Sequence, residues 1–257
     1  MNEEQGFPPP PQPPRPPQPP MPPQPPGPPG EPPAPRALEP LPWENRDQLG
    51  FAGGLVETIK LLIMNPAEAF QRARRTGDYA SPLFFGILVW WFSTMVAMLW
   101  QFLFNSASMA PMLQGMEDAG VAIAGTGVAL ILIAILAPAF ALISLFIWAG
   151  ILHLCLMIVG GLESSETGFE GTLRVVCYGS VAQLASIVPI LGGFITFAWQ
   201  IVLFVIGFIH VHRTTQGKSI LATLLPLILC CVCIIVVVMI AVGAGVGASS
   251  GFFESLQ

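Results

Sequence analysis

The chain has 257 residues, of which 53% are hydrophobic and only 10% are charged. Soluble globular domains use about 25% charged residues, so this composition excludes an ordinary soluble protein and indicates membrane segments. The formal net charge of −5 says little, because the charges are unevenly distributed along the chain.

The first segment, residues 1–42, holds 21 of the 27 prolines. From Pro10 to Gly30 they follow a three-residue repeat, which matches the three residues per turn of a polyproline II helix. Such a segment has few apolar side chains to bury, so we expect a disordered, proline-rich cytoplasmic tail. The repeat fits two interpretations, a ligand for SH3-like or WW-like grooves of a protein partner, or a spacer. No apolar stretch follows Met1, and we therefore expect no cleavable secretory signal.

Residues 43–81 predict amphipathic interfacial helices. Apolar side chains recur at helical spacing from Phe51 to Ile63, with charged residues on the other side. Asn65 and Pro66 then predict the start of a second helix, as its N-cap and its first helical residue. An arginine cluster follows, formed by Arg72, Arg74 and Arg75. Two arrangements remain open: the helices lie on anionic lipid head groups, or they pack on the cytoplasmic face of the membrane domain.

Five apolar segments between residues 82 and 247 predict a membrane domain with five transmembrane helices. At 1.5 Å per residue, the longer segments can cross the ~30 Å hydrocarbon core. The third segment is the weakest, because Arg174 lies near its start and polar residues follow, so we expect it to be buried between its neighbours. The expected spans are 82–104, 128–159, 172–188, 191–211 and 219–247.

The number of spans depends on Pro138, which in an alternative arrangement divides the second segment into a hairpin and gives six spans. The positive-inside rule favours five. With five spans and a cytoplasmic N-terminus, all ten lysines and arginines fall on the cytoplasmic side, including Arg213 and Lys218 between the last two spans. The sequence therefore predicts an all-α, polytopic membrane helix bundle, preceded by an interfacial amphipathic helix and a disordered tail.

No catalytic, cofactor-binding or metal site is expected. The sequence GKS at residues 217–219 resembles the end of a phosphate-binding loop, but His212 occupies the position that requires glycine. His210 and His212 point to different sides of a helix, so they cannot both face one metal ion, and the role of these two and of His153 stays open. No Asp, Glu, Lys or Arg lies near the middle of a span, which argues against a coupled transporter.

Other residues are expected to make packing or surface contacts. Gln183 and Gln200 can hydrogen-bond between helices inside the membrane. Gly243 and Gly247 form a small-xxx-small pair in the last span, which fits either close internal packing or a homo-oligomer contact. The candidate contacts to anionic lipid or to a partner are Arg72, Arg74, Arg75, Arg213 and Lys218.

Residues 49–235 resemble the YIP (Ypt/Rab-interacting protein) membrane domain, in the form found in bacterial proteins. The longest match is FEGTLRVVCYGSVAQLASIVPILGGFITFAWQIVLFVIGFIHVH at residues 169–212. The residues that carry the resemblance are Pro42-Trp43-Glu44, Asn65-Pro66, Phe70, Pro82-Leu83, Phe169, Thr172-Leu173, Tyr178, Ile187-Val188-Pro189, Gly192 and Trp199. The resemblance implies five spans, a cytoplasmic N-terminus and no enzymatic activity. The eukaryotic branch is associated with Rab-type GTPases, but its Asp-Leu-Tyr-Gly-Pro-like segment is replaced here by the proline tract.

Together these observations favour a non-enzymatic membrane protein that acts as a membrane-organising or partner-recruiting scaffold. The rival interpretation is a small permease or lipid-handling protein that uses polar groups of the third and fourth spans. The expected partners are the lipid bilayer, including anionic lipids, and a protein bound by the tail; no nucleic acid or cofactor is expected. We expect a bacterial plasma membrane, or a Golgi or ER membrane if the source is eukaryotic.

Overall fold

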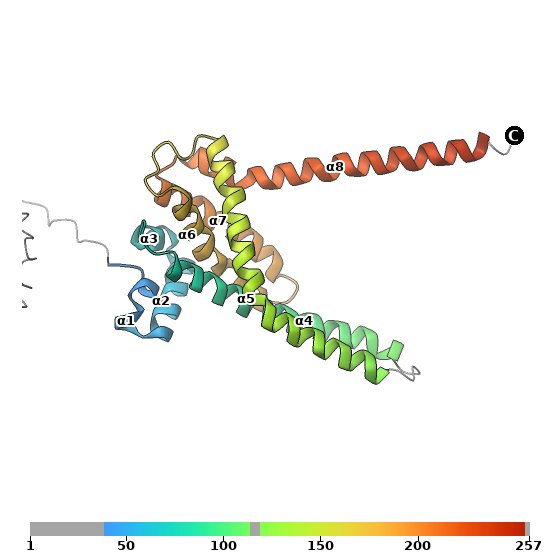
Figure 1. The fold of residues 1–257 in the computed structure, drawn as a ribbon, viewed down its shortest axis with the longest axis horizontal. Coiled ribbons are helices and arrows are strands. Elements are labelled where there is room, and N and C mark those ends of the chain that lie inside the picture. Colours follow the sequence, from blue (N-terminus) through green and yellow to red (C-terminus); the bar gives the residue numbers. More distant parts are fainter. Residues whose placement is uncertain (1–38, 114–118, 255–257) are drawn as a thin grey trace, which may run out of the picture. The chain divides into compact units, whose positions relative to one another are not determined.

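The computed structural model describes residues 39–113 and 119–254, with side chains except at 105–113, 119–126, 129 and 241–254. Most of the expected proline-rich tail, residues 1–38, therefore lies outside the described residues. Every regular element within them is a helix (Figure 1). In chain order these are η1 (Pro42–Asn45), α1 (Arg46–Leu49), α2 (Phe51–Met64), α3 (Pro66–Arg72), α4 (Ala80–Leu113), α5 (Ala119–Ile158), α6 (Gly168–Gly179), η2 (Ser180–Ile187), α7 (Gly192–His212) and α8 (Gln216–Glu254).

Four helices in the described part of the chain are long and apolar enough to cross a membrane. They lie in α4, α5, α7 and α8, where four of the five expected spans were placed. The stretches are Ala80–Phe104, Leu130–Ile158, Gly192–His212 and Gln216–Ile240. Pro138 lies inside α5 without ending it, so the alternative hairpin at this proline does not occur. Neighbouring helices can compensate for the backbone hydrogen bond that a proline removes from a membrane helix.

The expected third span, residues 172–188, is not confirmed as a membrane-spanning helix. The segment is divided into α6, which ends at Gly179, and the 3-10 helix η2. An α-helix of 12 residues is only about 18 Å long, which is too short for the hydrocarbon core. The expected burial is confirmed for the first part of the segment, because every residue from Glu170 to Gly179 is buried and α6 contacts α4, α5 and α7. It is wrong for the end of the segment, where Ile187 and Val188 are 50% and 45% exposed.

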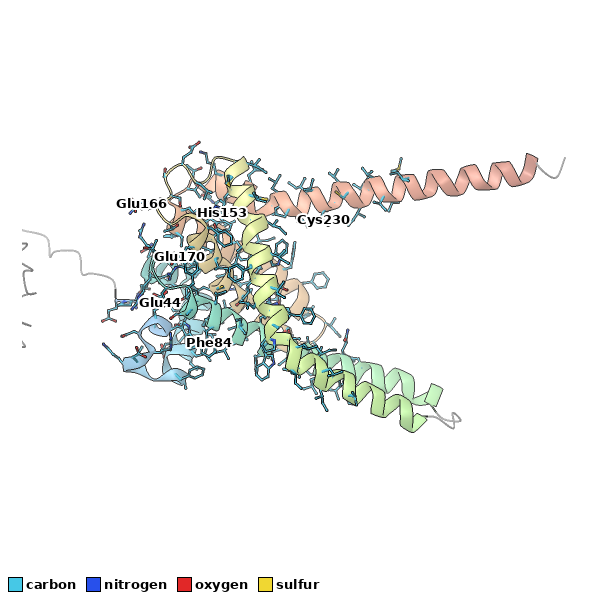
Figure 2. The ribbon with its side chains drawn as sticks, in the orientation of Figure 1. Glu44, Phe84, His153, Glu166, Glu170 and Cys230 are labelled. Carbon is cyan, nitrogen blue, oxygen red and sulfur yellow. The ribbon has the colours of Figure 1, made fainter. Side chains whose placement is uncertain are left out.

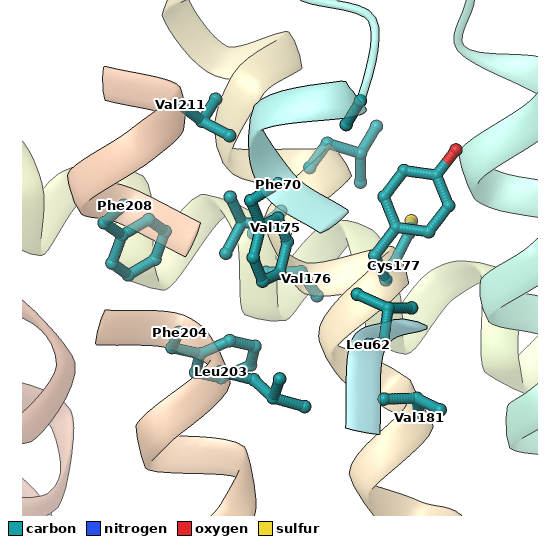
Figure 3. Packing of buried hydrophobic residues seen from close by; sticks show 14 of the residues in the cluster. Leu62, Phe70, Val175, Val176, Cys177, Val181, Leu203, Phe204, Phe208 and Val211 are labelled. Carbon is teal, nitrogen blue, oxygen red and sulfur yellow. The ribbon is translucent and has the colours of Figure 1, made fainter. Parts of the chain in front are cut away.

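The hydrophobic core lies around α6 and depends on close helix approach (Figure 3). A methyl group at Gly207 of α7 would lie 2.5 Å from Val175 Cγ1 and 3.1 Å from Phe70 Cζ. Glycine at this position therefore lets α3, α6 and α7 meet at one point. Leu203 and Phe208 of α7 continue the same buried surface.

The amphipathic helices α2 and α3 pack against the membrane domain, which is one of the two arrangements left open by the sequence. Leu62 of α2 and Phe70 of α3 are buried in the core, and α3 contacts α7. Phe51 and Ile63 were expected on the same apolar side, but they are 50% and 45% exposed. The buried face of α2 instead contains Gly54, and the chain that precedes α2 packs closely against this glycine.

Candidate functional site

A buried arginine of α6 joins the bundle to the segment before the first span. The side chain of Arg174 is 1% exposed and that of Glu44 in η1 is 0% exposed. Arg174 Nη1 lies 3.3 Å from Glu44 Oε1, and Arg174 Nη2 donates to Glu170 Oε1 at 2.6 Å. Figure 2 labels both carboxylates. Glu170 lies one helical turn before Arg174, so this second pair forms within α6.

Further hydrogen bonds connect these groups to the surrounding chain. We call Glu44, Glu170, Arg174 and Tyr178 the Arg174 cluster. The Tyr178 hydroxyl donates to Glu44 Oε1 at 2.8 Å, and the backbone N–H of Arg74 donates to Glu44 Oε2 at 2.9 Å. Arg174 Nη2 also donates to the carbonyl oxygen of Asp78 at 2.7 Å. Buried charges are tolerated when they are paired and hydrogen-bonded, so these contacts fix η1 and the chain before α4 against α6.

Trp43, next to Glu44, anchors the same segment. Its side chain is fully buried, its backbone N–H donates to Thr58 Oγ1 at 2.8 Å, and its indole Nε1–H donates to the Ser81 carbonyl oxygen at 2.7 Å. The ring also lies 5.8 Å from that of Phe85 in an edge-on arrangement. The Pro-Trp-Glu motif seen in the sequence therefore joins α2, α4 and α6.

The pKa values of Glu44 and Asp78 are set by burial and by hydrogen bonds, which act in opposite directions. Burial raises the pKa of Glu44, and hydrogen bonds from Arg74 N–H and Tyr178, together with nearby guanidinium charges, offset only part of that rise. Burial also acts to raise the pKa of Asp78, but hydrogen bonds from residues 80–81 outweigh it, so the pKa of Asp78 is lowered. The two carboxyl groups are therefore expected to titrate in separate pH ranges.

A second polar cluster lies between α5, α6 and α7. Thr172 Oγ1 lies 2.8 Å from His153 Nδ1 and 3.0 Å from His212 Nε2, and Ser165 Oγ lies 2.7 Å from His212 Nδ1. A hydroxyl has one proton, so Thr172 can donate to only one of the two rings and accepts from the other. His210 instead bonds the Ile206 carbonyl oxygen of its own helix, so His210 and His212 point apart as predicted.

The predicted arginine cluster is divided among different partners. Arg72 pairs with Glu68 of the same helix. The Arg74 side chain is half-exposed and lies 3.9 Å from Glu44 Oε2. Arg75 is exposed and has no ion-pair partner among the residues that the structure describes. The contact of these three arginines with anionic lipid or with a partner stays a prediction.

Arg213 and Lys218 connect two loops at the ends of the spans. Arg213 Nη1 lies 3.2 Å from Glu166 Oε1, and both side chains are exposed. Lys218 Nζ donates to the Gly160 carbonyl oxygen and to Glu163 Oε2, each at 2.8 Å. The turn between α7 and α8 is thus attached to the loop between α5 and α6.

The predicted intramembrane glutamines line a cavity of about 310 Å³. Neither Gln183 nor Gln200 makes a side-chain hydrogen bond within the described residues, so the expected interhelical bonds do not form there. The other packing prediction, at Gly243 and Gly247, falls outside the residues whose surroundings the structure describes.

Sequence reasoning missed the partners of Arg174. A charge inside an apolar segment needs a counter-charge, and this signal was present in the sequence. Glu170, one turn away, could have been found by its spacing, but Glu44 is 130 residues away and no local pattern indicates it. Within the described residues, no group of three or more His, Cys, Asp or Glu residues is arranged to hold a metal ion.

The chain matches a known protein family. The model of the Yip1 domain matches residues 60–238, which is more than half of the chain. Arg174 and Tyr178 fall inside the matched region, whereas Trp43 and Glu44 precede it. No curated protein and no solved structure matches the chain.

Proposed function

The protein belongs to the Yip1 domain family of multi-pass integral membrane proteins, and from this premise we propose that it is a non-enzymatic, membrane-organising scaffold. Its contact surface is formed by η1, α1, α2 and α3, residues 42–72, which we call the platform. The platform recruits a partner protein to the membrane at the end of the bundle where α4 begins.

The observation that carries this proposal is the attachment of the platform to the bundle by the Arg174 cluster. Glu44 belongs to the platform and Arg174 to the bundle, and both side chains are at most 1% exposed. Removing one partner of such a buried pair leaves the other charge uncompensated and costs roughly 3–5 kcal/mol, so the folded protein keeps the two groups together. A surface that is already held in one conformation loses less entropy when it binds, which favours a recognition role.

The outer face of α2 supplies the chemistry for a contact. Val56, Lys60 and Met64 are spaced four residues apart and therefore form one stripe on the helix. Val56 is 59% exposed, Met64 is 75% exposed, and Lys60 between them is exposed. Exposed apolar side chains grouped on one face mark candidate contacts with a protein partner, and the charge of Lys60 can pair with an acidic group of that partner.

The proposal includes five membrane crossings. At their ideal rises, α6 and η2 together measure about 34 Å, enough for a crossing that neither makes alone. Trp100 lies about 30 Å along α4 from Ala80 at 1.5 Å per residue. Its indole Nε1–H donates to the Ile187 carbonyl oxygen at 3.2 Å, at the end of η2. This contact supports a path in which α6 and η2 run the length of the first span.

Five crossings would put the two termini on opposite sides of the membrane. The platform would then lie in the cytoplasm, together with Arg213 and Lys218, in agreement with the positive-inside rule. We place the protein in a bacterial plasma membrane on the family resemblance of its sequence. A reporter fused after Gln257 should read as outside the cytoplasm, and a cytoplasmic reading would overturn the five-crossing topology.

Site-specific photo-crosslinking in cells tests the scaffold role. A photoreactive amino acid at Val56 in the full chain should form discrete adducts with protein. Lys60→Glu in the same chain should reduce these adducts about fivefold, the effect of losing a contact worth ~1 kcal/mol, whereas Lys60→Arg should retain them.

The control places the photoreactive group at Val236, on the exposed surface of α8. Only lipid adducts and diffuse background are expected there. Lipid adducts alone at Val56, or the same protein adducts from both positions, would contradict the scaffold role.

A further inference from the structure

A cavity of about 310 Å³ lies between α4, α5, α7 and α8, with α6 and η2 forming part of its wall. A second hollow of about 440 Å³ adjoins it. The residues that line both are Trp90, Trp148, Gln183, Phe197 and Gln200. Cavities of this size are typical of sites for small organic ligands, with apolar walls and a few polar groups that fix orientation.

Some polar groups of these walls have no protein partner, whereas the hydroxyls of Thr94, Ser180, Thr196 and Thr223 each donate to a backbone carbonyl oxygen. The amides of Gln183 and Gln200 make no hydrogen bond within the described residues, and neither does the Ser144 hydroxyl. In the adjoining hollow, Ser93 Oγ and Ser186 Oγ are buried without a hydrogen-bond partner. Buried polar groups are costly unless they are hydrogen-bonded, so this concentration indicates that something else satisfies them.

The cavity lies at membrane depth. Trp90 is about 15 Å along α4 from Ala80, and Gln200 is about 18 Å along α7 from His212, at 1.5 Å per residue. Ala80 and His212 lie at the same end of the bundle, because the Arg174 cluster and the polar cluster around Thr172 and His212 both involve α6. The glutamine amides therefore lie near the middle of a ~30 Å hydrocarbon core, where water is scarce.

The cavity also communicates with the surface that faces lipid. Among its lining residues, Trp148 is 49% exposed, Phe197 is 53% exposed and Leu227 is 41% exposed. A molecule already dissolved in the bilayer can thus enter sideways between the helices. No Asp, Glu, Lys, Arg or His lines either hollow within the described residues. A charged head group would lose its hydration there without gaining a counter-charge.

We propose that this cavity binds the head region of an uncharged lipid with hydroxyl and ester groups, of the diacylglycerol class. The amide N–H groups of Gln183 and Gln200 donate to ester carbonyl oxygens, and the amide oxygens accept from the free hydroxyl. The acyl chains leave through the opening beside Phe197 and extend into the bilayer. This site is independent of the platform and of its partner, so a negative result for lipid binding would not contradict the scaffold role.

Photolabelling of the purified full-length protein in lipid nanodiscs tests the site. The probe is a diacylglycerol that carries a diazirine in one acyl chain, and the reference probe is a phosphatidylglycerol with the same chain. The diacylglycerol probe should label peptides that line the cavity, and unlabelled diacylglycerol should compete. In the double variant Gln183→Leu and Gln200→Leu, cavity labelling should fall about tenfold, the effect expected from losing one to two hydrogen bonds.

The matched control is Gln101→Leu, which removes an exposed amide of α4 outside the cavity and should leave labelling unchanged. If the double variant does not elute as a single species on gel filtration, Ser144→Leu decides the same question by filling the cavity. Equal labelling by the anionic probe, labelling spread over the exposed face of α8, or retention of cavity labelling in these variants would overturn the proposal.

Discussion

Helix α6 is buried, whereas the distal part of α8, residues 227–240, is exposed. Every residue from Glu170 to Gly179 is buried, whereas every residue from Leu227 to Ile240 is exposed. The exposed segment is nevertheless the more hydrophobic of the two. The apolar window of α8 has a mean hydropathy of 3.2, the highest of the four candidate spans, while α6 contains an arginine and a glutamate.

The difference shows that burial in this protein does not follow hydrophobicity. Lipid solvates an apolar side chain about as well as a protein core does, so apolar surface alone does not drive helices together in a bilayer. Helix α6 is held by ion pairs, hydrogen bonds and glycine contacts, and the distal part of α8 presents its apolar side chains outward. The two regions should therefore respond differently to the same kind of substitution.

The largest effect is expected for Arg174→Met. The substitution leaves the carboxylates of Glu44 and Glu170 without the guanidinium between them, and should cost about 3–5 kcal/mol of unfolding free energy. The measurement is the thermal midpoint of the detergent-purified protein, followed by gel filtration after heating. Arg213→Met removes an exposed pair with Glu166 and should cost less than about 1 kcal/mol. Equal shifts would mean that the buried cluster does not hold the platform.

The next largest effect on stability is expected for a buried leucine, compared with an exposed leucine that also lies in an apolar helix. Leu203 is fully buried and Leu229 is 63% exposed. Leu203→Ala should create a cavity and cost about 2–5 kcal/mol. Leu229→Ala exchanges one lipid-facing side chain for another and should change stability by less than about 0.5 kcal/mol. The same thermal assay measures both, and a loss at Leu229 as large as at Leu203 would show that a second chain or an unseen contact covers this part of α8.

Alanine substitutions at two glycines should change the stability of the protein in opposite directions, depending on the packing around each glycine. A methyl at Gly207 would lie 2.5 Å from Val175 Cγ1, so Gly207→Ala should destabilise the protein by about 1–3 kcal/mol. A methyl at Gly150 of α5 meets nothing within 4 Å, so Gly150→Ala should stabilise it by about 0.5–1 kcal/mol through the helix propensity of alanine. Thermal midpoints that move in the same direction for both variants would contradict the packing described around α6.

Much of the fold could be predicted because local patterns encode it. The start of α3 at Pro66 follows from the local preferences for Asn at the N-cap position and Pro at the first helical position, although the Asn65 side chain makes no capping hydrogen bond, and the four apolar helices follow from hydropathy. The division of residues 172–188 into α6 and η2 could not be predicted in this way. Its conformation depends on partners in other parts of the chain, such as Trp100, which bonds the last residue of η2.

The candidate site was less predictable than the fold, for a related reason. The sequence indicated that Gln183 and Gln200 matter, but hydropathy cannot say whether an amide faces another helix or a cavity. It also indicated that Arg174 must be buried, but Glu44 is separated from it by 130 residues, and only the folded chain brings them together. Pairs at long sequence separation are specified by packing, which one sequence does not reveal.

The smallest predicted effect concerns the pH dependence of the Arg174 cluster. Because burial raises the pKa of Glu44 above 4.5, the folded protein binds a proton that the unfolded chain releases. The resulting stabilisation is fully present below pH 4.5 and is lost as the pH rises through the folded pKa, with a slope of at most about 1.4 kcal/mol per pH unit. Glu44→Gln removes this titration while keeping an acceptor for the Tyr178 hydroxyl. Its stability relative to the unmodified protein should therefore rise with pH across that window.

Asp47→Asn is the control, because it removes an exposed carboxyl of α1 that makes no contact with the cluster. Thermal midpoints of the three proteins, measured from pH 4 to 8, give the comparison. The groups that face Glu44 are Arg74, Arg174 and Tyr178, and each keeps its position in the variant if the platform stays attached. A constant difference between Glu44→Gln and the unmodified protein at every pH would show that the pKa of Glu44 is the same in the folded and the unfolded protein, and that its hydrogen bonds and its pairing with Arg174 fully offset its burial.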